Sequence, residues 1–398
     1  MKKLMILGAS ILQLPAIQQA KKMGLHVIAV DMNPDAIGFK EPGIQCEVLS
    51  TIDIPAVLKC AKDNAIDGIM TLASDMPMQT VAVVAENLGL VGVTKETALK
   101  ATNKAFMRDA LKGCNVPIPL YHRLSDYQEF LEAVNDIMSR GYKCIVKPAD
   151  NSGSRGVDLL KNNDAESLKN AFEYSKSFSR TGELVVEEYM EGPEVSVETL
   201  SIGGNCHVIQ ITDKITTGAP YFVEMGHSQP SMLSEKIKEE IAEVAKAANK
   251  ALGIMDGPSH TEIKVTKDGP KIVELGARLG GDNITTHLVP LSTGVNMVEC
   301  CIRIALGEVP DITAKCNKAA AIRYFKTNCG TVKNIIGIHD AELVLGVKQV
   351  SIVHGIGEEL KEIKSSTDRT GFVISQADSV DEAIRECEVA ISKVHFII

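Results

Sequence analysis

The chain has 398 residues, of which 45% are hydrophobic and 23% charged, and it carries a formal net charge of −9. This length exceeds a single hydrophobic core and predicts two or three packed units of a soluble globular protein. The negative charge gives no electrostatic support to a nucleic-acid partner.

The chain shows no pattern of a targeting or membrane segment. Its start, MKKLMILGAS, runs directly into a strand pattern, which leaves no separate signal peptide. No apolar run reaches membrane length, because Glu86 and Asn87 interrupt VAVVAENLGLVGV. The ten cysteines are scattered without a CxxC pair, which fits a reducing cytoplasm and argues against a zinc site. We therefore expect a cytoplasmic protein with no membrane partner.

Residues 1–95 alternate short apolar runs with helical patterns, which predicts a Rossmann-like α/β domain with a parallel sheet. The turn GASILQL lacks the GxGxxG fingerprint, so the pattern does not favour a nicotinamide cofactor. Asp31 follows the second strand and is interpreted as a strand-end cap or turn residue rather than a ribose ligand. Asp75 lies at a strand's C-terminal end, where such sheets bind ligands, and an N-cap role explains it equally well. The expected strands are KLMIL, HVIAV and DGIMTL, and helices are expected near 13–23, 54–62 and 77–88.

Beyond residue 95 the pattern changes to α+β. A helix near 103–113 falls in a connecting region, 96–116, which ends at the prolines of NVPIPLY. Residues 117–190 are predicted to form a small α+β subdomain, 191–307 a larger one with long alternating strands, and 308–398 a mixed C-terminal region. The remaining expected elements are helices near 126–140, 164–176, 234–252 and 293–306, and the strands YKCIVKP, GVDLL, ELVVEEYM, VSVETLSI, CHVIQIT and PYFVEMG.

The segment HTEIKVTKDGPKIVELGARLGGDN carries the most informative charges of the chain. It is predicted to be a β-hairpin, and a turn centred on Asp268 places Glu262 opposite Glu274 on one face. Opposed like charges cost stability unless a cation lies between them, and Mg²⁺ with nucleotide phosphates is a usual solution. An exposed hairpin with scattered charges is the alternative. The opposite, core-facing side is expected to carry Ile263, Val265, Val273 and Leu275.

The segment KPADNSGSRGV predicts a phosphate-binding loop. Lys147 ends a strand, and Gly153 and Gly156 follow in the loop. Glycines let backbone N–H groups close around phosphate oxygens, while Lys147 and Arg155 add positive charge. A plain hairpin turn would explain the loop by itself. The pattern GxxxxGK[ST] occurs nowhere, which excludes the ordinary P-loop architecture.

The segment VVEEYMEGPEVSVE is predicted to be a strand, a short turn and a second strand. The backbone at such a junction can bind an adenine edge, which fits Glu187, Glu188 and Met190. A carboxylate a few residues further on, Glu194, can accept the ribose hydroxyls. An acidic surface turn would also explain this segment.

These segments, in this order, resemble the ATP-grasp superfamily of carboxylate–amine ligases. The resemblance runs from Lys104 to Asn283, and residues 1–95 match the α/β domain that usually precedes it. Lys147 and Arg278 would carry the catalysis. The resemblance implies phosphate contacts from Lys104, Lys147 and the closing loop of Ser152, Gly153, Ser154, Arg155 and Gly156, adenine and ribose contacts at Glu187, Glu188, Tyr189, Met190 and Glu194, metal bridging by Glu262 and Glu274, and stabilisation of the reacting phosphate by Arg278.

One position departs from the family pattern. Many relatives carry Asn two residues after the second glutamate as a third metal ligand, and this chain has Gly276 there. Asp282, Asn283 or water would then complete the metal shell.

The segments TTGAPYFVEMGHSQPS, PSHTEIK and ELGARLGGD look like the L-amino-acid ligase branch. In them Glu224, His227 and His260 are candidate substrate residues, together with Asp282 and Asn283. Arg323, in AAIRYF, is a weaker candidate, for which a structural role is favoured.

The resemblance implies an ADP-forming enzyme. ATP with Mg²⁺ or Mn²⁺ would phosphorylate a small-molecule carboxylate, and an amine would attack the acyl phosphate, joining amino acids or similar molecules. Many relatives are dimers, so a homodimer is compatible with the resemblance. Two alternatives stay open: a bicarbonate-activating enzyme of the purine, biotin-carboxylase or carbamoyl-phosphate type, and a non-catalytic ATP-binding regulatory protein.

Overall fold

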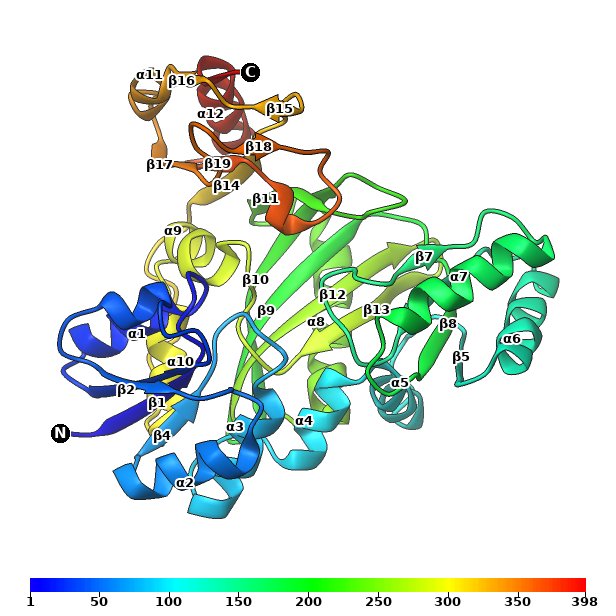
Figure 1. The fold of residues 1–398 in the computed structure, drawn as a ribbon, viewed down its shortest axis with the longest axis horizontal. Helices are drawn as coiled ribbons and strands as arrows, with labels where there is room; N and C mark the ends of the chain where they lie inside the picture. Colours follow the sequence, from blue (N-terminus) through cyan, green and yellow to red (C-terminus); the bar gives the residue numbers. More distant parts are fainter.

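The computed structural model describes residues 1–398. Its N-terminal part is a parallel sheet in the strand order β3-β2-β1-β4 (Figure 1). Alternation along β1 divides its side chains between two cores: Leu4 and Ile6 pack toward α1 and α10, whereas Met5 and Leu7 pack toward α2 and α3. The predicted parallel sheet is confirmed. The elements are β1 (Lys3–Leu7), α1 (Leu14–Lys22), β2 (His26–Asp31), β3 (Gln45–Val48), α2 (Ile54–Asn64), β4 (Gly68–Met70), α3 (Met78–Leu88) and α10 (Met297–Ala305).

Helix α10 reaches this sheet from a distant part of the chain. It corresponds to the expected helix near 293–306, which was assigned to the larger α+β unit. In the structure it lies beside α1 and covers one face of the N-terminal sheet. The backbones approach closely, since a Cβ on Gly68 would lie 2.6 Å from the carbonyl oxygen of Ala305. The N-terminal sheet and the large sheet are therefore tied together by a shared core.

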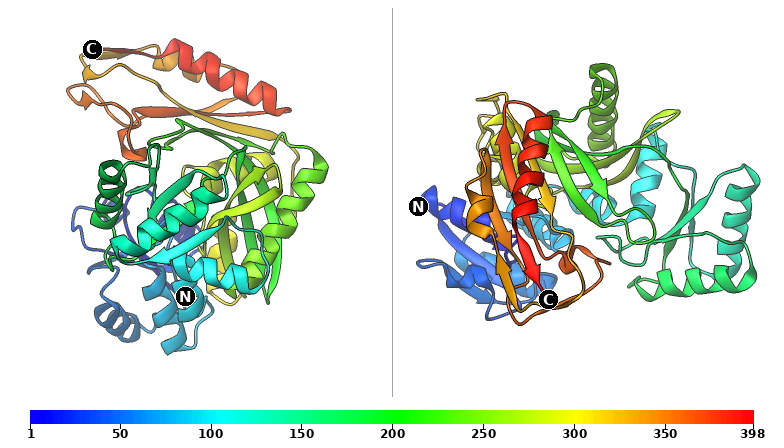
Figure 2. Two further views of the ribbon diagram at one scale, coloured as in Figure 1. Left: turned by 90° about the vertical axis from the view of Figure 1, so that its right-hand side faces the viewer. Right: turned by 90° about the horizontal axis from the view of Figure 1, so that it is seen from above.

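Two short helices connect the N-terminal sheet to a small antiparallel sheet of order β5-β8-β6-β7. The first, α4, was not predicted. Phe130 and Phe172, from the two helices that cover the small sheet, pack against Val146 and Val186. Figures 1 and 2 show this unit projecting from the body of the molecule. The elements are α4 (Lys95–Thr102), α5 (Lys104–Gly113), β5 (Tyr121–Leu124), α6 (Tyr127–Ser139), β6 (Cys144–Pro148), β7 (Asp158–Leu159), α7 (Ala165–Ser177) and β8 (Leu184–Glu188).

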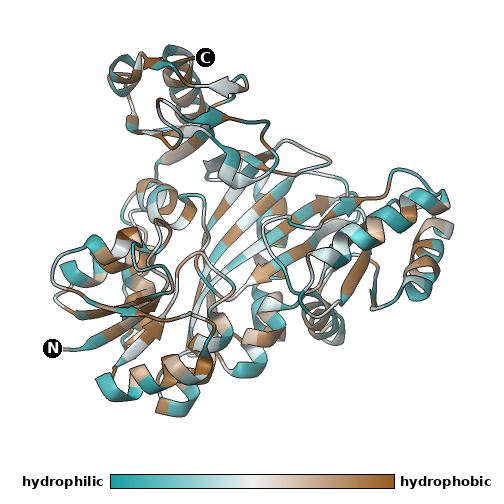
Figure 3. Cartoon of the chain, in the orientation of Figure 1, coloured by the Kyte–Doolittle hydropathy of each residue, from teal (hydrophilic) through white to brown (hydrophobic).

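The rest of the chain is organised around an eight-stranded antiparallel sheet of order β13-β12-β9-β10-β11-β14-β19-β17. Polar and apolar residues alternate along β9 and β12 (Figure 3), and the apolar face packs on α8. Strand β11 begins at residue 224, later than the expected strand 220–226. The elements are β9 (Glu194–Ile202), β10 (Asn205–Thr216), β11 (Glu224–Gln229), α8 (Glu235–Leu252), β12 (Gly257–Thr266) and β13 (Gly269–Gly276).

Part of the C-terminal region continues the large sheet, while β15 with β18 and β16 with β20 form two separate two-stranded sheets. The strands β14, β19 and β17 of this region follow β11 in the order of the large sheet, and α12 packs against them. No single helix of the structure has both the length and the apolar character needed to cross a membrane, and one bent pair, 284–293 with 297–305, meets that test by length and composition only. The elements are η2 (Ile284–Leu288), α9 (Val289–Thr293), β14 (Ala319–Tyr324), β15 (Gly330–Thr331), β16 (Asn334–Ile336), α11 (Ile338–Glu342), β17 (Val347–Ile352), β18 (Glu359–Leu360), β19 (Gly371–Ala377), α12 (Val380–Lys393) and β20 (His395–Ile397), with short 3₁₀ turns at Ile37–Lys40 (η1) and Ser366–Asp368 (η3).

Candidate active site

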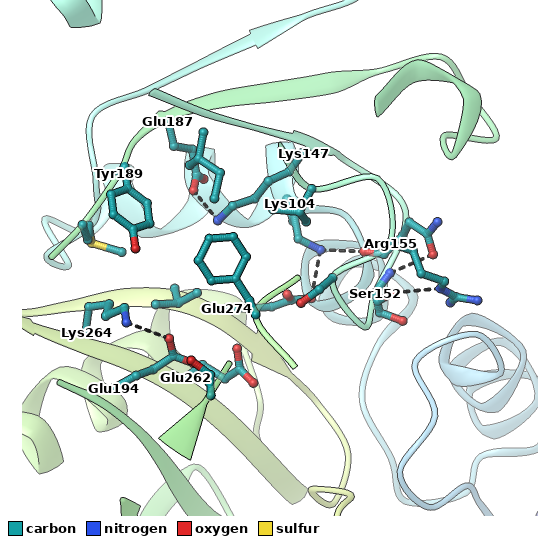
Figure 4. A pocket seen from close by; sticks show the side chains of 18 of the residues that line it. Lys104, Lys147, Ser152, Arg155, Glu187, Tyr189, Glu194, Glu262, Lys264 and Glu274 are labelled. Carbon is teal, nitrogen blue, oxygen red and sulfur yellow. Dashed lines mark hydrogen bonds and ion pairs between the residues drawn. The ribbon is translucent and has the colours of Figure 1, made fainter. Parts of the chain in front are cut away.

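A cleft with about 850 Å³ of free space lies between the small sheet and the large sheet (Figure 4). We call it the first cleft. Its lining comes from α5, from β6 and β8 of the small sheet, and from β9, β12 and β13 of the large sheet. Among its lining residues are the following, from the expected phosphate, adenine, ribose and metal sites: Lys104, Lys147, Ser152, Ser154, Arg155, Glu187, Glu188, Tyr189, Met190, Glu194, Glu262 and Glu274.

Lys147 is fixed at the end of β6 by a buried ion-pair cluster. Its Nζ lies 2.8 Å from Glu187 Oε2, and Arg108 Nε donates to the other oxygen, Oε1, at 2.6 Å. Burial would raise the pKa of Glu187, but the two cations outweigh it and lower this pKa to about 2. The cluster therefore holds a charged lysine at the wall of the first cleft.

The expected adenine contact of Glu187 is not supported by its geometry. Glu187 lies within β8, where it pairs with Tyr121 of β5 and Ile145 of β6. Both oxygens of its carboxylate form ion pairs, one with Arg108 and one with Lys147. The side chain of Glu188 is also engaged, with Lys271 at 2.9 Å. Sequence spacing could not show this, because both cations of the Glu187 cluster come from other elements.

Aromatic and apolar side chains line the same end of the first cleft. Tyr189 and Met190 follow β8 there, and Phe222 reaches in from the loop before β11, with its ring centroid 6.2 Å from that of Tyr189. Sequence reasoning missed Phe222, because its segment was expected to be strand. The structure instead places it in a turn with a φ of 51°. Flat apolar walls of this kind suit a planar ring.

The phosphate-loop candidates lie between two clefts. Ser152, Ser154 and Arg155 line the first cleft, while Ser152, Gly153 and Ser154 line a second one. Gly153 and Gly156 have φ values of 68° and 77°, a backbone conformation that favours glycine. A Cβ on Gly156 would lie 2.7 Å from side-chain atoms of Pro148 and Phe178, so this glycine is also required by close packing.

Lys104 and Glu274 form one side of the metal-site candidates. Asn103 caps α5 by accepting from two backbone N–H groups, which fixes the helix start at Lys104. Lys104 Nζ then donates to Glu274 Oε1 at 3.1 Å and to the carbonyl oxygen of Asn151 at 2.6 Å. Lys104 is buried and lines the first cleft.

The hairpin pairs Glu262 directly with Glu274, as predicted, but through a β-bulge. The tight turn pairs Thr266 with Gly269, and the register shifts by one residue between Ile263 and Glu262. Val273 is the extra residue of the bulge. The expectation that Val273 faces the core is therefore wrong: it lines the first cleft, and Ile272 takes the core position beside Ile263 and Leu275.

Lys214 of β10 is a central site residue that sequence reasoning missed. Its buried Nζ lies 2.7 Å from Glu194, 2.8 Å from Glu262 and 3.5 Å from Glu224. Burial would lower the pKa of Lys214, but the three carboxylates raise it well above its ordinary value. The expected strand CHVIQIT stops before Lys214, so no sequence pattern marked this residue. Lys214 partly neutralises the glutamate pair, a role that the sequence interpretation gave to metal alone.

The glutamate pair fits a divalent metal that keeps most of its positions for other oxygens. Glu262 and Glu274 each use Oε1 for a lysine, and Oε2 of neither accepts a hydrogen bond within the protein. No group of three or more His, Cys, Asp or Glu side chains is arranged to hold a metal ion. Mg²⁺ is commonly held by one or two carboxylates, with phosphate oxygens and water completing its octahedron. The two carboxylates suit Mg²⁺ with phosphate and water ligands, and they do not form a site made of protein ligands alone.

A second cleft, with about 860 Å³ of free space, adjoins the first and shares both glutamates with it. His260 lies on its wall, with Nδ1 2.6 Å from Glu198 and Nε2 3.6 Å from Glu262. Burial would lower the pKa of His260, but Glu198 outweighs this effect and raises the pKa to about 9. His260 is therefore a cation near neutral pH, and it lines the second cleft. Glu224 and His227 also line this cleft.

Asp282 is bound by protein groups, so the structure does not support it as a third metal ligand. Arg369 donates to both of its oxygens at 2.7 Å, and His227 lies 3.3 Å from Oδ2. Burial would raise the pKa of Asp282, but Arg369 and His227 outweigh it and lower the pKa. Asn283 immediately precedes η2, has a φ of 62° and does not line the second cleft. Sequence reasoning missed Arg369, because it comes from the C-terminal region.

Arg278 also lines the second cleft, and Asp75 holds it. Arg278 Nε and Nη2 donate to the two oxygens of Asp75 at 2.8 and 3.0 Å. Burial would raise the pKa of Asp75, but Arg278 lowers it. Asp75 is not an N-cap, because α3 begins at Met78 after Pro77. Asp31 is the last residue of β2, and its oxygens accept the backbone N–H groups of Ala9 and Asn33, which is consistent with a strand-end cap.

Arg323 is buried in β14 and lies outside both clefts. Its Nη1 donates to the carbonyl oxygens of His227 and Ile322, each at 2.9 Å. The structural role favoured for it is consistent with these bonds.

Comparison with known proteins places this geometry in a family. Residues 140–286 match the ATP-grasp domain, and residues 323–398 match the L-amino acid ligase C-terminal domain 2. The L-arginine-specific L-amino acid ligase of Bacillus subtilis is 26% identical over 327 residues, covering 78% of this chain and 75% of that protein. A phosphoribosylamine–glycine ligase of Methanocaldococcus jannaschii is 25% identical over 402 residues, covering 94% and 89%.

The fold agrees with these matches over the full chain. The crystal structure of an L-amino acid ligase from Bacillus licheniformis superposes with a TM-score of 0.85 at 25% identity, covering 100% of this chain and 98% of that one. The predicted fold class and the resemblance are both confirmed. The chain therefore contains an ATP-grasp domain followed by an L-amino acid ligase C-terminal domain, and these matches identify it as an ADP-forming ligase that makes C–N bonds.

Proposed function

We propose that the enzyme activates the carboxylate of one amino acid, or a similar small molecule, and joins it to the amine of another. ATP binds in the first cleft and transfers its γ-phosphoryl group to the carboxylate, which forms an acyl phosphate and ADP. The amine then attacks the acyl carbon from the second cleft, the C–N bond forms, and phosphate leaves with the electron pair of the C–O bond. The match of residues 323–398 to an L-amino acid ligase domain favours amino acids as substrates.

The observation that carries this proposal is the position of Glu262 and Glu274. The two carboxylates face each other at the boundary of the two clefts, and each keeps one oxygen free of protein hydrogen bonds. They would hold Mg²⁺, or Mn²⁺, which supplies charge neutralisation to the phosphates when bound.

The side chains around the glutamates would divide the remaining work. Lys104 and Lys147 would hold the phosphates, and the loop Ser152–Gly156 would cover them and exclude water that hydrolyses an acyl phosphate. Tyr189 and Met190 would contact the adenine, and Glu194 the ribose. Arg278, at the wall of the second cleft, would stabilise charge on the transferring phosphoryl group and on the tetrahedral intermediate.

The test is phosphate release from ATP across a panel of amino-acid pairs, with and without bicarbonate. We expect release only when a carboxylate donor and an amine acceptor are both present. Release with bicarbonate and no amino acid would replace the proposal with carboxyphosphate chemistry. ATP binding without any stimulated release would indicate a non-catalytic regulatory protein.

A variant of Arg278 tests the catalytic assignment. Arg278→Met removes the charge at similar volume and is expected to lower kcat by roughly 10²–10³-fold, as loss of other preorganised charge stabilisers does. The matched control is Arg140→Met, which removes an exposed arginine just after α6 that pairs only with Asp136. Near-normal turnover of the Arg278 variant would refute the role of this residue.

A further inference from the structure

The ion pair between Asp75 and Arg278 joins two separate sheets at the site. Asp75 lies in the loop between β4 and α3 of the N-terminal sheet, and Arg278 follows β13 of the large sheet by two residues. Their contact is bidentate, with distances of 2.8 and 3.0 Å. Two parallel N–H to oxygen bonds fix the plane of the guanidinium as well as its position.

Little else in the surroundings fixes the Arg278 side chain. Its only other protein hydrogen bond runs from Nη1 to the carbonyl oxygen of Leu279 at 3.3 Å. Arg278 also borders a mainly apolar cavity of about 430 Å³ between the two sheets, so packing there is incomplete. A guanidinium has five N–H donors, and three are used by Asp75 and Leu279. One donor on each of Nη1 and Nη2 remains for substrate.

The absence of a side chain at Gly276 leaves room for the Asp75–Arg278 ion pair beside β13, the strand that carries Glu274. A Cβ on Gly276 would lie 2.9 Å from Asp75 Oδ1 and 3.2 Å from Arg278 Nε. Its φ is not in the left-handed region, so backbone conformation does not require a glycine. The space above Gly276 is taken by the ion pair. The position where relatives of this chain were expected to carry a metal-binding Asn thus serves a different purpose here.

We propose that Asp75 is a positioning residue of the ligase, which aims Arg278 into the second cleft, and that Gly276 is glycine because a side chain there would displace this pair. The inference rests on the proposed role of Arg278. It follows that the N-terminal sheet completes the active site from outside the first cleft, since no residue before Lys104 lines that cleft.

Kinetics of Asp75→Asn test the proposal in the full-length enzyme. We expect kcat to fall roughly 10–100-fold, as for other groups that orient a catalytic residue, while KM for ATP is unchanged. In the Arg278→Met background the same change should cost nothing further, because there is no guanidinium left to orient. Asp75→Glu should recover part of kcat. Asp31→Asn, at the end of β2 of the same sheet, is the control and should keep wild-type kcat.

Gly276→Ala gives an independent test, because it leaves both charges in place. The added Cβ should push the pair aside and lower kcat without lowering ATP affinity. The melting temperature of every variant is measured alongside. Wild-type kcat in Asp75→Asn, or losses that simply add in the double variant, would overturn the positioning role. Near-normal turnover in Arg278→Met would instead overturn the proposed function of Arg278.

Discussion

The first cleft contains two clusters of glutamates and cations that differ in how completely they are closed. In the closed cluster, Glu187 is 1% exposed and both its oxygens bind cations, Arg108 and Lys147. This carboxylate has almost no exposed surface and no oxygen left for a further ligand. The open cluster consists of Glu262, Glu274, Lys104 and Lys214.

In the open cluster, Glu262 and Glu274 are 24% and 29% exposed, and each has only one oxygen engaged by a lysine. The same pair of residue types is thus used in two ways. Full pairing turns a glutamate into a fixed part of the wall, whereas partial pairing leaves it able to bind a further cation. Exposure and partner count separate a structural carboxylate from a ligand-binding one here, and sequence does not.

Glu187→Gln breaks the closed cluster and should therefore lower the free energy of unfolding more than the other variants. Removing one partner of a buried ion pair leaves uncompensated charge and typically costs about 3–5 kcal/mol. We expect a correspondingly lower urea midpoint, together with weaker ATP binding because Lys147 loses its anchor. The control is Glu188→Gln, whose partner Lys271 is less buried than Arg108. If both variants unfold at the same urea concentration, the closed cluster does not contribute more to stability than the ion pair of Glu188 with Lys271.

Glu274→Gln breaks the open cluster and should affect activity strongly and stability little. We expect kcat to fall by roughly 10² or more, as for lost electrostatic stabilisation of a phosphoryl group, with little change in melting temperature. Raising the Mg²⁺ concentration should restore part of the activity if the carboxylate is a metal ligand. Full activity of this variant at low Mg²⁺ would contradict the metal role.

His260 allows a finer test through pH. Its pKa is raised to about 9 in the folded protein, mainly by Glu198 with Glu262, against burial and the nearby charge of Arg278. Because the folded pKa lies above the unfolded one, the stabilisation is complete below about pH 6.5 and is lost as pH rises through 9. The melting temperature should therefore decrease as the pH is raised from about 6.5 to about 9, and it should decrease less in His260→Gln.

The matched control for the pH test is His122→Gln, which changes a half-exposed histidine paired with Asp136. Its melting temperature should follow the wild-type pH profile. An unchanged profile in His260→Gln would show that the histidine does not contribute this stabilisation.

Much of the fold was predictable because local patterns carried it. Short apolar runs identified β1 and β2, alternation identified β9 and the hairpin, and side-chain caps mark helix starts such as Asn103 before α5. Helix α4 and the true start of β11 were missed, since the apolar patterns there are short. The continuation of the large sheet into the C-terminal region was also not visible, because β11 and β14 pair across almost a hundred residues.

By itself, the sequence determined the family and the facing glutamates, because the lysines, the glycine loop and the spacing from Glu262 to Glu274 are local signals in a fixed order. Tertiary structure decided the partners of each charge. Lys214, Asp75 and Arg369 reach the site from elements far away in the chain. The physical reason is that the electrostatic state of a carboxylate depends on burial and on its nearest cations, and the fold brings those together from distant segments.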